Sequence, residues 1–161
     1  MTLDNNAIME MADKIVKVTK NLYAKMKKHP HTFHMWYKDG KVEVFLLQDM
    51  FKNDDTKDIA GFFMRNATTQ KRDQLAFVMF TSEAWIVKSP TDDIGIRPSH
   101  HPDRKEVIQF ILETAVGIWA KTVYVKDGQL TGEEADWTEV SDTRGRLVSY
   151  GLVDKTGGMY R

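Results

Sequence analysis

Two short turns constrain the fold of this chain more than any other feature of its sequence. Residues 38–41 (KDGK) and 126–129 (KDGQ) each place an Asp-Gly pair between segments of β-forming residues. Asp-Gly favours the two-residue turn whose twist matches that of paired strands, because both central residues can adopt positive φ. The sequence therefore predicts two antiparallel hairpins, one joining residues 31–37 to 42–47 and one joining 118–125 to 129–140.

Two segments have the apolar periodicity of helices. Residues 5–28 carry an apolar residue at every third or fourth position, with Asp4 placed as the N-cap and Pro30 just beyond the end. A second segment follows Asp54 and Asp55, whose charges suit the positive end of a helix dipole. The sequence thus predicts a long N-terminal amphipathic helix and a short second helix.

Two long runs predict the centre of the sheet. Residues 74–88 and 105–116 are rich in aromatic and branched side chains, which is typical of strands buried on one or both faces. Residues 146–153 predict a last short strand, and residues 155–161 a flexible tail. In this order the elements predict one α+β domain over residues 1–161, a long-stranded and mainly antiparallel sheet with both helices on one face.

Composition narrows the classes of function. The chain has 23 Lys and Arg against 23 Asp and Glu, so its overall charge gives no long-range attraction for nucleic acid. Six lysines between residues 14 and 28 still leave nucleic-acid binding through the first helix as a minor alternative. No cysteine, signal peptide or membrane-spanning run is present in the sequence, from which we expect a cytoplasmic protein that does not contact a membrane.

The common local motifs of enzymes are missing. The sequence contains no phosphate-binding loop, dinucleotide-type glycine motif, zinc-protease motif or serine nucleophile elbow. We therefore expect no cofactor and no metal, and we consider an enzyme less favoured than a binding protein. The histidines at positions 29, 31 and 34 are explained by capping of the preceding helix rather than by metal binding.

Glu83 is the most informative single residue, because strand alternation places it among apolar side chains on one face. A carboxylate in such a place is costly unless it has a partner. If residues 74–88 and 105–116 pair as neighbours, Gln109 and Glu113 reach the same face in one of the two registers. Glu83, Gln109 and Glu113 would then form a polar row beside Trp85, able to bind a ligand or to exchange protons. The alternative is that this face is wet or neutralised by basic residues.

A second candidate site lies in the long connection between these two strands. It contains an imidazole, guanidinium and carboxylate set suited to an anion, made of Arg97, His100, His101, Asp103 and Arg104. Adjacent histidines in extended backbone point in opposite directions, so they do not readily share a metal ion. The alternative is an ordered surface loop in which Asp103 and Arg104 anchor the following strand.

Residues 74–116 also carry a recognisable pattern. A Ser-Glu-Ala-Trp strand at 82–85 is followed by a His-Pro-Asp-Arg-Lys-Glu strand entry at 101–106. In this pattern the segment resembles small bacterial and phage-type proteins to which no activity is assigned. The resemblance implies the two strands and the loop between them, and it implies no chemistry.

Together these observations favour a non-enzymatic accessory or binding protein that acts as a homo-oligomer and takes a small molecule or a protein as its ligand. Long strands leave sheet edges that need a cover, and a second copy supplies one. One alternative is a hydrolase-like acid-base enzyme that uses Glu83 and Glu113 with the loop histidines. The other is the nucleic-acid binding protein described above.

Overall fold

The computed structural model describes residues 4–47, 50–87, 102–140 and 150–153 of the 161-residue chain. Residues 150–153 are irregular backbone, so the strand that the sequence predicts at 146–153 is not formed there, and its first part lies outside the described residues. The predicted tail at 155–161 also lies outside them.

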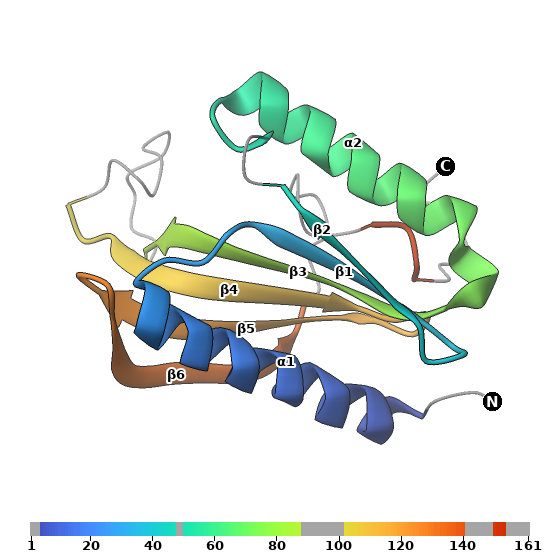
Figure 1. Ribbon diagram of the computed structural model, residues 1–161, viewed down its shortest axis with the longest axis horizontal. Helices are drawn as coiled ribbons and strands as arrows, with labels where there is room; N and C mark the ends of the chain where they lie inside the picture. Colours follow the sequence, from blue (N-terminus) through green and yellow to red (C-terminus); the bar gives the residue numbers. More distant parts are fainter. Residues whose placement is uncertain (1–3, 48–49, 88–101, 141–149, 154–161) are drawn as a thin grey trace.

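Among the described residues, one antiparallel sheet of six strands forms the centre of the fold (Figure 1). Its order is β2-β1-β3-β4-β5-β6, and every pair of neighbours is antiparallel. Both Asp-Gly hairpins and both long central strands are confirmed. The strands are β1 (Thr32–Tyr37), β2 (Val42–Leu46), β3 (Leu75–Ile86), β4 (Lys105–Glu113), β5 (Ile118–Lys126) and β6 (Gln129–Glu139).

Two capped helices accompany the sheet. Helix α1 (Asn5–Met26) begins at Asp4, whose carboxylate accepts the Ala7 N–H at 2.8 Å, and ends at Lys27 in a left-handed conformation. Helix α2 (Asp54–Gln70) begins with a capping box in which Asn53 and Thr56 bond to each other's backbone N–H. It is followed by a short 3₁₀ turn, η2 (Arg72–Gln74). At 17 residues α2 is a helix of full length rather than the short one that the sequence predicts.

The α+β class is confirmed, but the two helices cover opposite faces of the sheet rather than one (Figure 1). In β3, Phe77 and Met79 pack with the buried residues of α1, whereas Val78 and Phe80 pack with those of α2. The reason is that β3 and β4 have apolar residues on both sides. Each side needs its own apolar cover, so a single helical layer on one face is insufficient.

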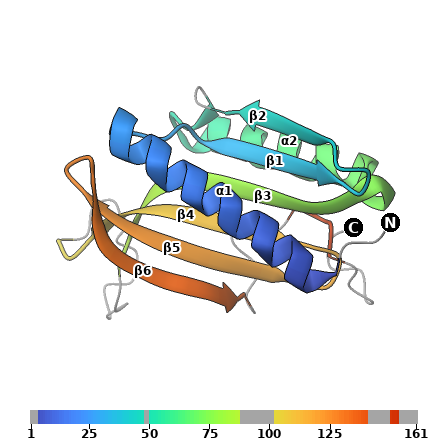
Figure 2. The ribbon, with the colours of Figure 1, turned by 60° about the horizontal axis from the view of Figure 1, so that its bottom comes forward.

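Helix α1 crosses its face of the sheet obliquely and does not cover all of it (Figure 2). It is held to β6 by the Trp137 indole N–H, which donates to Asp13 at 2.8 Å, and by an ion pair between Lys20 and Glu134 at 2.5 Å. On the other side of α1, the apolar residues of edge strand β2 remain exposed. This uneven cover positions the groove described below.

Neither described helix combines the length and the apolar character that crossing a lipid bilayer requires.

Candidate functional site

The residues of the predicted polar row do not meet. The register of β3 and β4 pairs Ser82 with Gln109 and Glu83 with Ile108. Directly paired residues share a face, so Glu83 lies on the α1 side of the sheet, and Gln109 and Glu113 lie on the α2 side. The register is thus shifted by one residue from the one that would have formed the row, and such a shift reverses the face of every side chain.

Glu113 has a structural role, in which its carboxylate binds backbone groups. Its side chain is fully buried, and its carboxylate accepts the backbone N–H groups of Tyr150 at 2.7 Å, Val153 at 2.8 Å and Leu152. Burial raises the pKa of the Tyr150 phenol well above its ordinary value, and the Glu113 charge adds to this. Glu113 therefore ties the segment at 150–153 to the α2 side of the sheet, where Tyr150 and Leu152 join the core.

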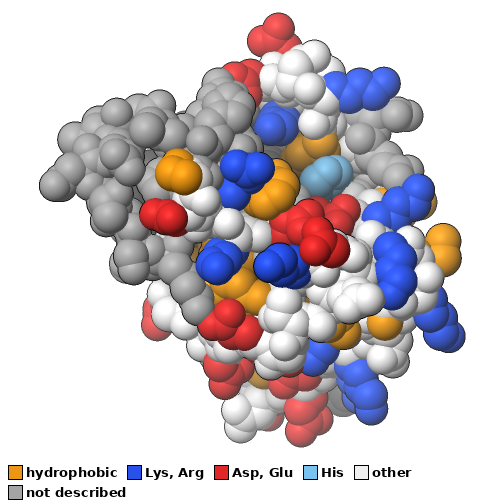
Figure 3. All heavy atoms as spheres, turned by 90° about the vertical axis from the view of Figure 1, so that its left-hand side faces the viewer, with side chains coloured by type: hydrophobic (Ala, Val, Ile, Leu, Met, Phe, Trp, Pro, Cys, Tyr) orange, Lys and Arg blue, Asp and Glu red, His pale blue; other side chains and the backbone are white. Residues whose placement is uncertain are grey.

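Glu83 lies half-buried at the end of the molecule where α1 finishes. Burial raises the pKa of this carboxyl and the nearby Glu106 raises it further, while a hydrogen bond from the His29 backbone and the charge of Lys28 oppose the rise. Figure 3 views the molecule from this end, where carboxylates gather beside a histidine and basic side chains. Glu83 is thus a half-buried carboxylate with a raised pKa, and neither Gln109 nor Glu113 of the predicted row lies on its side of the sheet.

The candidates around the long connection are only partly described. Trp85 is 40% exposed, and the Arg104 guanidinium lies 4.8 Å from the centre of its ring, which is a cation–π contact. Asp103 is exposed and has interaction partners, as Arg104 does. Arg97, His100 and His101 lie outside the described residues. Among the residues that the structure does describe, no group of three or more His, Asp and Glu is arranged to hold a metal ion.

The structure contains a polar contact between His31 and Ser82 that no sequence pattern predicted. His31 Nδ1 lies 2.7 Å from Ser82 Oγ, and the His31 ring stacks on Phe51 with their centres 4.1 Å apart. The Ser82 hydroxyl also donates to the Glu83 carbonyl at 2.9 Å. A hydroxyl has one hydrogen, so His31 then donates to Ser82 and does not act as the base that would activate it.

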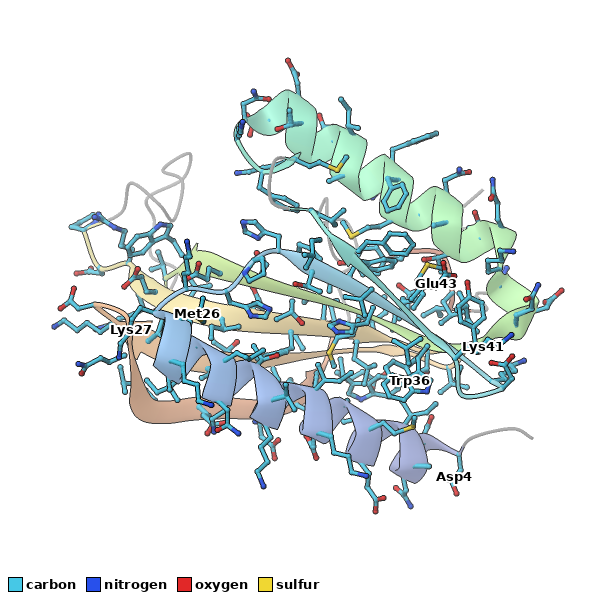
Figure 4. The ribbon with its side chains drawn as sticks, viewed as in Figure 1. Asp4, Met26, Lys27, Trp36, Lys41 and Glu43 are labelled. Atoms are coloured by element: carbon cyan, nitrogen blue, oxygen red, sulfur yellow. The ribbon has the colours of Figure 1, made fainter. Side chains whose placement is uncertain are left out.

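The main functional candidate in the described part of the chain is an apolar groove between α1 and the β1–β2 hairpin, with a volume of about 730 Å³. Its walls include Val18, Leu22 and Met26 of α1, which are 47–61% exposed, and Val44 and Leu46 of β2, which are 52% and 66% exposed. Figure 4 shows Met26 and Trp36, which line it from the helix and from β1. None of the described lining residues is an acid, and two are the lysines Lys14 and Lys28.

The groove has two polar atoms in its floor without a partner. They are His34 Nδ1 and Trp36 Nε1, and neither makes a hydrogen bond within the described part of the chain. Burial lowers the pKa of His34 to about 4, and the nearby His29 contributes to the decrease. The ring is therefore neutral at pH 7, so the floor of the groove carries no charge from it.

The sequence did not predict the groove, because all the apolar residues of the N-terminal helix were assigned to one buried face. The fully covered stripe of α1 contains Ile8, Ala12, Val16, Thr19 and Tyr23. A second apolar stripe, with Ile15, Val18, Leu22 and Met26, continues beyond it. An apolar arc wider than the buried face is the signal that a sequence reading could have used.

Comparison with known proteins gives no relative for this chain. No protein family model, curated protein or solved structure matches it.

We expect the Glu113→Gln variant to lose about 3–5 kcal/mol of unfolding free energy, since an amide NH₂ would face backbone N–H donors that now bond to the carboxylate. Urea unfolding followed by circular dichroism measures this. Glu106→Gln on the same strand is the matched control, with an expected change below about 1 kcal/mol. Equal, small effects for both variants would contradict the anchoring role.

We expect the effect of Glu83→Gln on stability, relative to the wild type, to be most favourable at neutral pH. The folded protein holds the Glu83 proton more tightly than the unfolded chain, so the contribution of this group to stability falls as pH rises above its ordinary pKa of 4.5. Glutamine does not titrate. The melting temperature of the variant minus that of the wild type should therefore increase between about pH 4 and about pH 7. A variant that loses stability relative to wild type over this interval would instead indicate a structural ion pair.

Proposed function

We propose that this chain is a non-enzymatic, cytoplasmic binding protein that acts as a homo-oligomer and takes an amphipathic anion in the groove between α1 and the β1–β2 hairpin. The ligand class is an elongated apolar chain with one acidic group, as in a fatty acid. The observation that carries the proposal is a large groove with exposed apolar walls and no acid among its described lining residues.

The apolar walls support the tail of such a ligand. Pockets that bind small molecules commonly measure about 300–1,000 Å³ and are mostly apolar, with a few polar groups that set orientation. The groove, at about 730 Å³, falls inside that range. Covering walls such as Val18 and Leu46 removes apolar surface from water at roughly 25 cal/mol per Å².

The two lysines support the acidic group. Lys14 lines the groove from α1 and Lys28 follows the end of this helix, and both side chains are exposed. A carboxylate near an exposed lysine gains a charge-assisted hydrogen bond without the cost of burying the ammonium group. Because no acid lines the groove in the described part of the chain, an anionic ligand meets no like charge there.

The two alternative functions have less support. A hydrolase that uses Glu83 with Glu113 needs both carboxylates on one side of the sheet, whereas they lie on opposite sides and Glu113 bonds to the backbone. Nucleic-acid binding needs a basic face, and in α1 Lys20 is paired with Glu134. Neither alternative has an observation of its own in its favour.

Titration with 11-(dansylamino)undecanoic acid tests the proposal, since dansyl emission increases when the probe leaves water. We expect saturable binding that dodecanoate competes away. Leu22→Glu places an acid on the groove wall and should weaken binding at least tenfold, which is about 1.4 kcal/mol. Ile59→Glu is the matched control, because Ile59 is a comparably exposed residue on α2.

The Lys14→Gln variant distinguishes recognition of the ligand's acidic group from binding of its apolar tail. The variant should raise the Kd of the dansyl probe and the inhibition constant of dodecanoate. The inhibition constant of dodecanol, calculated with the variant's own probe Kd, should stay unchanged. Absence of saturable probe binding, or equal losses in Leu22→Glu and Ile59→Glu, would contradict the proposed site.

A further inference from the structure

Alternate residues of β2 direct their backbone N–H and C=O groups toward the outer edge of the sheet. Among the described residues β2 pairs with β1 alone. The Leu47 N–H donates to the His31 carbonyl and the Tyr37 N–H donates to the Lys41 carbonyl, both at 2.8 Å. Bonding alternates along an antiparallel pair, so residues 41, 43, 45 and 47 bond to β1. The amide groups of Val42, Val44 and Leu46 therefore point away from the sheet.

The same three residues also carry the exposed apolar side chains of this strand. Val42, Val44 and Leu46 are opposite Trp36, His34 and Thr32 of β1, so their side chains lie on the α1 side of the sheet. They are 38%, 52% and 66% exposed. Their outward amide groups and their exposed side chains thus form one continuous surface.

We propose that this surface binds a second copy of the chain, with the two β2 strands antiparallel about a two-fold axis at Val44. In that register Val44 lies opposite the partner subunit's Val44, and Val42 lies opposite the partner subunit's Leu46. All three pairs are of the hydrogen-bonded kind, in which each pair exchanges two bonds. The inference rests on the homo-oligomeric part of the proposed function, and it does not require the ligand.

The surface complements itself in shape and area. A two-fold interface must bring one patch against its own copy, and a strand of three outward apolar residues does so without opposing like charges. The single acid of β2, Glu43, lies on the other face and accepts a hydrogen bond from the Tyr37 hydroxyl. Six apolar residues around the edge and groove walls are 38–66% exposed: Val18, Leu22, Met26, Val42, Val44 and Leu46. Together they expose on the order of 600 Å², against about 800 Å² per partner in stable dimers.

The opposite edge of the sheet is protected against such pairing. Strand β6 carries four acids, at positions 133, 134, 136 and 139, and its pairing with β5 has two register shifts. Charged residues and irregular pairing are the usual means by which proteins prevent edge strands from associating. The contrast between the two edges favours β2 as the site of self-association.

Size-exclusion chromatography with light scattering measures the oligomeric state. We expect a wild-type mass of twice the 18.6 kDa chain at micromolar concentration. Val44→Lys puts two ammonium groups opposite each other at the axis and should give a monomer. Ile59→Lys is the control, because Ile59 is similarly exposed but lies on α2, which covers the other face of the sheet, and this variant should remain a dimer.

Single-cysteine variants test the register, since the natural chain has no cysteine. Cα atoms of a hydrogen-bonded pair lie about 5.5 Å apart, within the distance that a disulfide spans. Val44→Cys should therefore cross-link to itself under mild oxidation. Val42→Cys and Leu46→Cys should each cross-link poorly alone and efficiently when the two variants are mixed.

A monomeric wild type, or a dimer in which Leu22→Cys cross-links as well as Val44→Cys does, would overturn the proposed pairing. The probe titration of the wild type separates the two proposals. A monomer that binds the dansyl probe leaves the ligand site standing without the dimer, and a Val44-linked dimer that does not bind it leaves the dimer without the ligand site.

Discussion

Burial of β3 and β4 on both faces is the constraint on which the rest of the structure depends. Every residue from Phe77 to Phe80 is buried, and successive side chains supply two different cores. Apolar surface on both sides needs cover on both sides, so α1 closes one face, and α2 with the segment at 150–153 closes the other. The fully buried Glu113 belongs to this arrangement, because its carboxylate fixes that segment by accepting backbone N–H groups.

The groove follows from the same constraint. One helix cannot cover a face six strands wide, and α1 is held near β6 by its contacts with Trp137 and Glu134. The β1–β2 hairpin on the far side therefore keeps apolar residues in contact with solvent. A ligand in the groove and a second copy on the β2 edge would each reduce this exposure, and both would contact Val44 and Leu46.

Local features of the sequence predicted much of the fold and little of the site. Asp-Gly turns, apolar periodicity and β-rich runs are signals within a few residues, and they yielded both hairpins, both helices and the central strands. The side of the sheet on which each residue lies could not be predicted in the same way, because β3 begins as a continuous apolar run with no alternation. The register of β3 and β4 places Glu83 and Gln109 on opposite sides of the sheet. Glu113 accepts a hydrogen bond from the Tyr150 N–H, 37 residues away in the sequence, which no local pattern predicts.

The division of the helices between the two faces is tested most directly by a spin–spin distance between Lys17→Cys on α1 and Ile59→Cys on α2, in a doubly labelled protein diluted with unlabelled protein. Layers about 10 Å thick place the helix axes about 20 Å apart across the sheet, and both labels point outward. We expect a pulsed dipolar distance well beyond that value. Strong dipolar broadening of the continuous-wave spectrum, as expected for neighbouring helices with axes about 8–10 Å apart, would contradict the account.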